Sequence, residues 1–282
     1  MKLKGFIIII LLFTVSTYSN AFTVDTIYTK TDSLIYESCI KSLQQYKRPT
    51  LINIAKQFLG KPYIASTLET REKENLIINL RELDCTTLAE TCIAIHLTIN
   101  TGNSSFSDYC KKLSEIRYRN GEINGYSSRL HYMTDWTYEN HKNGVLEDIS
   151  MQLGGEIIDK QINYMTTHIH SYKYLKDNKQ NVDKMKIIEE EINGRDNYQV
   201  IPINKIANTE KKIKDGDIIL FATTIKGLDY SHVGIAYHKK DGQLSFIHAS
   251  SKEKKVVVEN KSLLEYCRSS KTCSGITVLR LY

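Results

Sequence analysis

The chain has 282 residues, of which 41% are apolar and 25% are charged, and its 38 basic and 32 acidic side chains give a formal net charge of +6. This profile is typical of a globular protein, and it excludes a disordered chain, a collagen-like repeat and a multi-span membrane protein. Basic and acidic side chains are interleaved along the chain instead of gathering in one basic stretch, so we expect no nucleic-acid partner.

Residues 1–21 have the pattern of a secretory signal peptide. Two lysines give a positive start, residues 6–15 are almost wholly apolar, and Ser19 and Ala21 are small residues where such a leader is cut. The apolar run is shorter than the roughly 20 residues that span a bilayer, which argues against a membrane anchor. We therefore expect cleavage after Ala21, a secreted or periplasmic location, and no stable membrane insertion of the mature chain.

Apolar residues at helical spacing predict four helices in the first part of the mature chain. The second of them ends at Gly60, and Pro62 follows, which is a common helix stop. The third begins near Asp84. The predicted helices are a short one within residues 22–48 and three over 51–59, 87–99 and 106–118.

The pattern is weak from about 120 to 208 and changes to a period of two after a turn at 215–217. Asp241 and Gly242 give a strong hairpin signal. Helices followed by an antiparallel sheet make an α+β fold, and because no linker divides it we expect residues 22–282 to form one domain. The strands of the predicted meander are 218–222, 231–238, 244–248, 255–259 and 276–281.

Cys85 is the first candidate for chemistry, because it opens the helix that Asp84 precedes. A free thiol with a pKa of about 8.5 is only a few per cent thiolate at pH 7, and a helix N-terminus raises that fraction. The backbone N–H of Cys85 is also a candidate donor to a developing oxyanion. The alternative is a buried structural thiol, which is how most cysteines are used.

His232 and His248 form the second candidate group, at the start of one predicted strand and on the next. A two-residue turn would place position 251 opposite His232, so a bulge or a longer loop is needed to bring both imidazoles onto one face. Such a pair suits a general base and its orienting partner. The alternative is a metal pair, but zinc needs further ligands and His-Glu-x-x-His is absent, so we expect no metal.

Several motifs, in their order along the chain, resemble those of the NlpC-type papain-like cell-wall hydrolases. They are Gly60-Lys61-Pro62-Tyr63, Asp84-Cys85, Asp215-Gly216-Asp217-Ile218, Ser231-His232-Val233-Gly234 and His248-Ala249-Ser250. The resemblance implies a papain-like core of about 50–100 and 210–282, with the nucleophile at a helix N-terminus packed on the C-terminal sheet. An insertion of about 101–209 would then shape specificity. The resemblance also implies that Cys85 is the nucleophile, His232 the general base, His248 the orienting group and Tyr63 an oxyanion donor, with no cofactor.

The chain departs from the common pattern of these enzymes at Ala65-Ser66, at Thr86-Thr87 and in the long spacing between Tyr63 and Cys85. These departures, together with residues 129–136, resemble one branch that was long classed as a domain of unknown function. Its activity is that of an N-acetylmuramoyl-L-alanine amidase acting on anhydro-muropeptides. The resemblance implies a cysteine amidase that cleaves the amide between the muramic acid lactyl group and L-Ala, with peptidoglycan disaccharide-peptides as its partners.

Trp136 is the only tryptophan and lies in a polar segment. An aromatic face with several donors is what a sugar needs, and the alternative is a core tryptophan with surface neighbours. Guided by the resemblance, we expect substrate contacts from Asp84, Thr86, Arg129, His131, Tyr132, Asp135, Trp136 and Ser231.

The remaining cysteines have simpler interpretations. We expect Cys92 in the core and Cys39 and Cys110 buried or free, whereas Cys267 and Cys273 flank a short polar loop and form either a local disulfide or two thiols.

Two other functions stay open at this point. An endopeptidase of the same clan would cut between D-Glu and the diamino acid of the stem peptide. A non-catalytic cell-wall binding module would use the same scaffold without turnover, and a zinc amidase is a more distant option. We expect the protein to be a monomer.

Overall fold

The structure is a computed structural model that describes residues 26–69, 73–195 and 198–282, so the predicted leader of residues 1–21 lies outside the described residues. Its α-helices are α1 (Lys30–Leu43), α2 (Leu51–Ala55), α3 (Cys85–Asn100), α4 (Phe106–Arg117), α5 (Met133–Lys142), α6 (Tyr164–Thr167), α7 (Lys179–Asn193), α8 (Ile203–Thr209) and α9 (Leu263–Ser269). Its strands are β1 (Thr26–Ile27), β2 (Leu76–Ile77), β3 (Leu146–Asp148), β4 (Glu156–Ile157), β5 (Gln199–Pro202), β6 (Ile218–Thr223), β7 (Tyr230–His238), β8 (Leu244–Ser250), β9 (Lys255–Val258) and β10 (Cys273–Leu281).

The four helices that the N-terminal pattern predicts are confirmed as α1 to α4. The second is shorter than expected, because the chain tightens into a 3-10 turn at Lys56–Phe58 and then reaches Gly60 with a φ of +83°. A residue with a side chain adopts that φ only with strain, which explains why glycine ends the helix. The helices α5 and α7 lie in the segment where the pattern is weak.

The main sheet has the strand order β4-β5-β10-β6-β7-β8-β9, with β3 paired to β10, and every pair in it is antiparallel. Strands β6 to β9 form the predicted meander. The position of the last strand is a correction, because β10 pairs with β6 and does not follow β9. The helix α9, which the sequence pattern does not reveal, lies between β9 and β10 and packs on the sheet as the chain crosses to the far side of β6.

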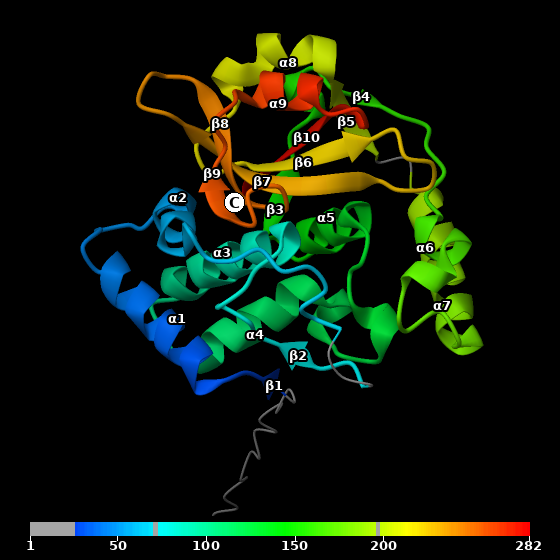
Figure 1. Ribbon diagram of the computed structural model, residues 1–282, viewed down its shortest axis with the longest axis horizontal. Coiled ribbons are helices and arrows are strands. Elements are labelled where there is room, and N and C mark those ends of the chain that lie inside the picture. Colours follow the sequence, from blue (N-terminus) through cyan, green and yellow to red (C-terminus); the bar gives the residue numbers. More distant parts are fainter. Residues whose placement is uncertain (1–25, 70–72, 196–197) are drawn as a thin grey trace, which may run out of the picture.

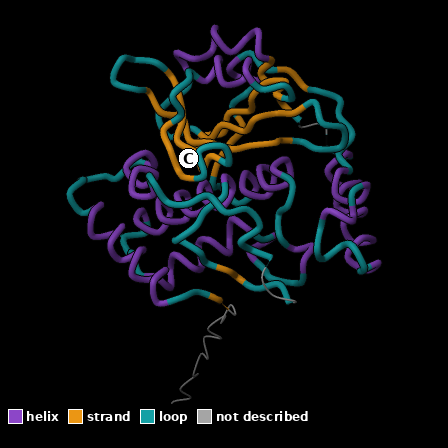
Figure 2. Tube along the Cα trace, in the orientation of Figure 1, coloured by secondary structure: helices purple, strands orange, loops and turns teal. Residues whose placement is uncertain are grey.

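Helices cover both faces of this sheet. In Figures 1 and 2, α2, α3, α4 and α5 lie beneath the strands, α8 and α9 lie above them, and α6 and α7 lie at one end. The fold is therefore α+β, as predicted. The described residues contain no helix that is long and apolar enough to cross a membrane.

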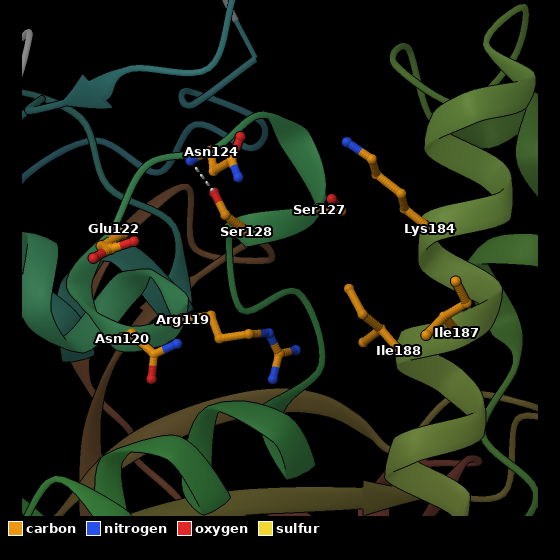
Figure 3. A pocket seen from close by; sticks show the side chains of 9 residues that line it. All are labelled: Arg119, Asn120, Glu122, Asn124, Ser127, Ser128, Lys184, Ile187 and Ile188. Carbon is orange, nitrogen blue, oxygen red and sulfur yellow. Dashed lines mark hydrogen bonds between the residues drawn. The ribbon is translucent and has the colours of Figure 1, made fainter.

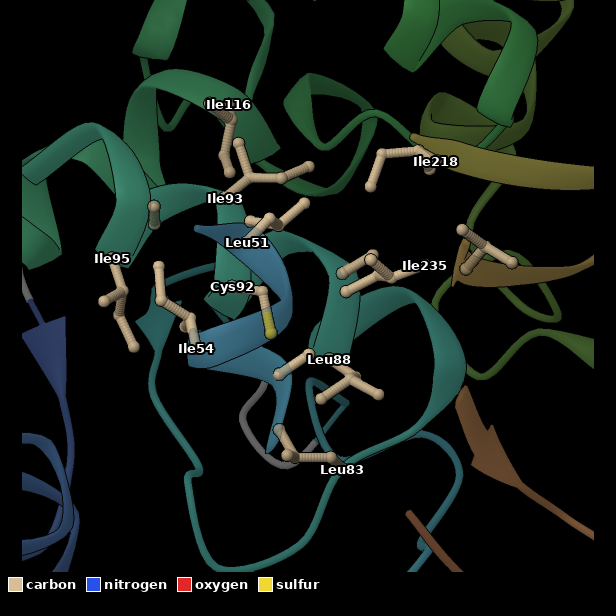
Figure 4. Packing of buried hydrophobic residues seen from close by; sticks show 14 of the residues in the cluster. Leu51, Ile54, Leu83, Leu88, Cys92, Ile93, Ile95, Ile116, Ile218 and Ile235 are labelled. Carbon is tan, nitrogen blue, oxygen red and sulfur yellow. The ribbon is translucent and has the colours of Figure 1, made fainter. Parts of the chain in front are cut away.

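The core beneath the sheet fixes the position of α3. One buried cluster joins α3 to α2 on one side and to the sheet on the other, as Figure 4 shows. Its members include Leu51 and Ile54 of α2, Leu88 and Cys92 of α3, and Ile218 and Ile235 of the sheet. Cys92 is fully buried, which confirms its expected place in the core. Burial of apolar surface stabilises a fold by roughly 25 cal/mol per Å². Because α3 buries apolar surface against both α2 and the sheet, its position is fixed from two sides.

Two further clusters complete the packing. On the upper face, α9 contributes Leu263 and Cys267 to a cluster with the sheet residues Phe221 and Phe246. Within residues 101–209, a separate cluster packs α7 against the segments around Tyr126, Tyr132 and Met165.

Candidate active site

Cys85 is the first residue of α3, as predicted. Asp84 is the N-cap, and its carboxylate accepts the Thr87 backbone N–H at 2.8 Å, while the Thr87 hydroxyl oxygen accepts the Asp84 N–H at 2.9 Å. Such a reciprocal cap is worth about 1 kcal/mol and fixes where the helix begins. The Cys85 side chain is partly exposed, unlike the core residues that follow it. The thiol is therefore held at a capped, partly exposed helix end.

Tyr63 is brought beside Cys85 by backbone pairing. The Tyr63 N–H donates to the Lys254 carbonyl at 2.9 Å, and Tyr63 also bridges to Leu83, two residues before Cys85. Burial, the Cys85 sulfur and the Asp84 carboxylate raise the pKa of the Tyr63 phenol. The phenol is therefore protonated at neutral pH and available as a donor next to the thiol.

His232 and His248 meet on one face of the β7–β8 hairpin. The hairpin loop spans residues 239–243, longer than a two-residue turn, and the register pairs Ile235 with Ile247. Continued along the strands, that register places Gly234 opposite His248, so the two imidazoles are diagonal neighbours. Nε2 of His232 lies 2.7 Å from Nδ1 of His248. The expected pairing through a longer loop is confirmed.

The hairpin also meets the helix end. The backbone N–H of Val233, which directly follows His232, is a hydrogen-bond partner of the Cys85 sulfur and lowers the pKa of the thiol. The structure therefore brings Cys85, Tyr63, His232 and His248 into one site.

The charge state of the resting site differs from the expectation of an activated thiolate. Burial and the neighbouring Asp84 carboxylate raise the pKa of Cys85 to about 11, and they outweigh the hydrogen bonds that lower it. Burial and the neighbouring His248 lower the pKa of His232 to about 3. The physical reason for the correction is desolvation, which disfavours the charged form of both groups. At neutral pH the resting pair is therefore a thiol and a neutral imidazole.

Two aromatic side chains pack near the two imidazoles on the side of α9. The ring of Tyr266 lies 6.2 Å from His232 and 5.9 Å from His248 between centroids, and Phe246 lies 4.7 Å from His248. Gly234 leaves room for the Phe246 ring, since a Cβ there would lie 2.5 Å from Cδ2 of Phe246. Sequence reasoning missed Tyr266, because α9 carries no recognisable motif.

Glu259 is a second residue that sequence reasoning missed. It follows β9, and its Oε2 lies 3.5 Å from Nε2 of His248. Its carboxylate raises the pKa of His248, although burial has the larger effect and lowers that pKa to about 4. A carboxylate beside the outer nitrogen of a histidine pair has no signature in the sequence, because the contact is made across strands β8 and β9.

A cavity of about 190 Å³ adjoins the nucleophile. It lies directly beside Cys85, since both neighbours of that residue in the chain line it. Its lining includes four of the predicted substrate contacts, namely Asp84, Thr86, Arg129 and His131. Burial and the adjacent Arg129 lower the pKa of His131 to about 3, so its ring is neutral, and it lies 2.8 Å from the Tyr126 carbonyl oxygen. Arg129 lies 3.4 Å from Glu74 and 3.5 Å from Glu69 without a tight hydrogen bond from Nε or Nη2.

Three other predicted substrate contacts are wrong. Trp136 is fully buried in the core and offers no face to a sugar. Tyr132 is buried and hydrogen-bonded to Glu189 at 2.7 Å, and Asp135 is buried between Arg119 and Arg195. Tyr132 and Asp135 are therefore engaged by internal partners, the first in a hydrogen bond and the second in two ion pairs. Ser231 is exposed beside His232, and its hydroxyl makes a long hydrogen bond of 3.5 Å to the Phe221 carbonyl.

A larger cavity, of about 310 Å³, lies elsewhere and contains none of the four residues of the site. Figure 3 shows Lys184, Ile187 and Ile188 of α7 facing Arg119 and Asn124 across it. Among the described residues, no group of three or more His, Cys, Asp or Glu side chains is arranged to hold a metal ion.

Cys267 and Cys273 are free thiols in the structure, buried and hydrogen-bonded to each other, so the disulfide alternative is not formed. Cys39 is buried and Cys110 partly exposed, both as free thiols.

Comparison with known proteins identifies the chain's relatives. A family model described as AmiA-like, N-acetylmuramoyl-L-alanine amidase-like, matches residues 53–276. No curated protein matches the chain significantly. Several solved structures are similar over most of their length.

An N-acetylmuramoyl-L-alanine amidase from Bacteroides uniformis is 39% identical, with a TM-score of 0.77 over 82% of this chain and 98% of that one. A protein from Bacteroides fragilis that is named as a candidate xylanase is 40% identical, with a TM-score of 0.75 over 80% and 98%. A Legionella pneumophila protein with the family model DUF1460 is 23% identical, with a TM-score of 0.65 over 89% and 94%, and shares the fold. The family match and the amidase neighbour support a general peptidoglycan amidase function. The chain belongs to the AmiA-like family of N-acetylmuramoyl-L-alanine amidase-like proteins.

Proposed function

We propose that the protein is a thiol-dependent N-acetylmuramoyl-L-alanine amidase with an NlpC-type papain-like core. It cleaves the amide between the muramic acid lactyl group and L-Ala in disaccharide-peptide fragments. The observation that carries the proposal is the convergence of Cys85, His232, His248 and Tyr63 beside a polar cavity. These are the parts that acyl transfer through a thioester needs.

In the acylation step, the Cys85 sulfur attacks the lactyl carbonyl carbon while its proton moves to His232. Because the resting pair is neutral, this proton transfer accompanies the attack and does not precede it. The Cys85 N–H and the Tyr63 hydroxyl donate to the oxyanion. The imidazolium of His232 then protonates the departing L-Ala amine, the C–N bond breaks, and a thioester remains on Cys85.

In the deacylation step, His232 takes a proton from water, and the resulting hydroxide attacks the thioester carbonyl. The same two donors stabilise the second oxyanion. The proton returns to the sulfur as the C–S bond breaks, which releases the sugar lactyl acid and restores the thiol. The step consumes one water molecule and needs no external reductant or oxidant.

A glycosidase function, as in the name of the Bacteroides fragilis neighbour, is a poorer fit to this site. Glycoside hydrolysis ordinarily needs two carboxyl groups free to act as acid and nucleophile or base. Beside Cys85, the Asp84 carboxylate is engaged in capping α3, and Glu90 is paired with Arg117 at 2.7 Å. Glu69, the third carboxyl group of the cavity beside Cys85, lies 3.5 Å from the guanidinium of Arg129. Each carboxyl group of the cavity therefore faces a cap or an arginine, whereas the thiol and the imidazoles meet beside it.

We further propose that residues 22–282 are one catalytic domain in which the segment of about 101–209 shapes specificity. Arg129 and His131, which lie in this segment, line the cavity beside the nucleophile and support the assignment. We also propose export to a secreted or periplasmic location through the leader of residues 1–21.

The test is the digestion of a purified disaccharide-tetrapeptide, followed by mass spectrometry of the products. The amidase releases the free disaccharide and the intact stem peptide. A shortened stem still attached to sugar would show an endopeptidase. Full biological effect without turnover, retained in Cys85→Ala, would show a binding module, and loss of activity with a chelator would indicate a metal amidase.

A further inference from the structure

The carboxylate of Glu259 lies at the end of a line of side chains that runs through His248 to His232, and the backbone N–H of the next residue, Val233, is a hydrogen-bond partner of the Cys85 sulfur. Nε2 of His232 lies 2.7 Å from Nδ1 of His248. On the outer side of His248, Nε2 lies 3.5 Å from Oε2 of Glu259. The other carboxylate oxygen of Glu259 accepts the backbone N–H of Lys261 at 3.0 Å, which fixes the orientation of the group.

Within the part of the chain that the structure describes, Glu259 is the group that faces the outer nitrogen of His248. This nitrogen is buried and makes no close hydrogen bond to another group of the described residues, so the Glu259 carboxylate is the acceptor that faces it. A buried N–H without a partner is unfavourable, which favours a donor at Nε2 aimed at this carboxylate. The distance is longer than a tight hydrogen bond, as is common before substrate binds.

The proton positions along the line follow from this arrangement. Nε2 of His232 is engaged with His248, so Nδ1 is the nitrogen left to accept the thiol proton. A neutral imidazole carries one N–H, which then lies on Nε2 of His232 and donates to Nδ1 of His248. His248 must accordingly carry its own N–H on Nε2, which faces Glu259.

The opposite set of tautomers would disable the site. His248 would then donate from Nδ1 to His232, and His232 would present an N–H to the thiol and accept no proton from it. That arrangement also points the lone pair of Nε2 of His248 at a carboxylate, which is repulsive. The carboxylate therefore favours the tautomers in which His232 can accept the thiol proton over those in which it cannot.

We propose that Glu259 is a positioning residue that sets the tautomers of His248 and His232 and stabilises the imidazolium that forms when Cys85 attacks. This role rests on the proposed function for the Cys85–His232 pair. The proton travels only between the sulfur, His232 and the substrate, and none is transferred to the carboxylate. Glu259 acts through His248 and does not touch the reacting atoms.

The first experiment compares Glu259→Gln with Glu253→Gln in steady-state kinetics on the disaccharide-tetrapeptide. The glutamine at 259 keeps an oxygen for the Lys261 N–H and removes the charge, whereas Glu253 is an exposed residue of the loop between β8 and β9. We expect kcat to fall by about tenfold to a hundredfold at position 259 with little change in KM. The control is expected to match the wild type.

The pH profile separates positioning from a merely structural role. The groups that face His248 are His232 of β7, Glu259 after β9 and Tyr266 of α9. Because the Glu259 carboxylate raises the pKa of His248, its loss moves the acid limb of kcat/KM to lower pH. A kcat loss with an unmoved acid limb, or a wild-type kcat in Glu259→Gln, would overturn the proposal.

A second measurement needs no substrate, so its result does not depend on the proposed function. ¹⁵N NMR of histidine-labelled protein reports which ring nitrogens carry protons. We expect Nε2–H on both His232 and His248 in the wild type, and a mixture of tautomers in Glu259→Ala. Nδ1–H on His248 in the wild type would refute the positioning role, whereas correct tautomers without any turnover would instead refute the proposed function.

Discussion

A buried ion pair between Arg117 of α4 and Glu90 of α3 connects these two helices, and α3 carries the candidate nucleophile. Removing the pair tests how much it stabilises the fold. The two side chains are 2% and 3% exposed, with Nε of Arg117 2.7 Å from Oε2 of Glu90. Arg117 also donates to the Ile77 carbonyl at 2.7 Å. In Arg117→Met the Glu90 carboxylate stays buried without a partner, and breaking a buried pair in this way costs about 3–5 kcal/mol.

Urea unfolding measures this loss as a lower midpoint with an unchanged slope. The double variant Glu90→Leu, Arg117→Met removes both charges and is expected to recover much of the loss, since paired hydrophobic replacement is often close to neutral. It leaves the Ile77 carbonyl without its donor, which costs about 1–3 kcal/mol. A loss below about 1 kcal/mol in Arg117→Met, or a double variant as unstable as the two single variants combined, would refute the reasoning.

The same variant has a predictable dependence on pH. Burial raises the pKa of Glu90, and Arg117 opposes that rise. Without Arg117 the pKa rises further, and a carboxyl whose folded pKa lies above its unfolded value loses stability as pH rises through the folded pKa. The stability deficit of Arg117→Met is therefore expected to shrink as the pH falls from neutral into the acidic range. A deficit that grows on acidification would contradict this account.

Three further predictions concern the site itself. Tyr63→Phe removes one oxyanion donor and is expected to lower kcat by about 10²–10³ with little change in KM, whereas an unchanged kcat would exclude Tyr63 from the oxyanion site. Iodoacetamide is expected to modify Cys85 before the buried Cys92, slowly at neutral pH and faster as the pH approaches 11. Mass spectrometry of tryptic peptides gives the order of labelling, and modification of Cys92 first would contradict this prediction. Gly234→Ala forces a Cβ to within 2.5 Å of the Phe246 ring and is expected to destabilise the fold by about 1–3 kcal/mol in thermal unfolding, with a neutral result counting against close packing beneath the imidazoles.

Features with local causes could be predicted from the sequence. The start of α3 follows from the Asp84 cap. The contact between the two imidazoles follows from the alternation of side chains along the two strands of the hairpin, provided that the loop is longer than two residues. The place of β10 could not be predicted, because its partner is chosen by the crossing of α9 over the sheet and not by any pattern within the strand.

The errors within the site come from tertiary environment. Asp135 and its neighbours look like sugar ligands in the sequence, yet Arg119 and Arg195 arrive from distant segments and enclose the carboxylate. The sequence places Cys85 at a helix N-terminus, which lowers the pKa of a thiol. Desolvation, which arises only in the assembled site, has the larger effect and raises that pKa. The Glu259 carboxylate reaches His248 only because β9 pairs with β8.

The most direct test of the central claim is the mass of the covalent intermediate. Wild-type protein is mixed with excess disaccharide-tetrapeptide, quenched in acid within the first turnovers, and digested for peptide mass spectrometry. The account predicts a disaccharide-lactyl thioester on the peptide that contains Cys85, absent from Cys85→Ala. A thioester that also carries L-Ala and D-Glu would contradict the amidase assignment, and an acyl group on any other residue would contradict the assignment of Cys85 as the nucleophile.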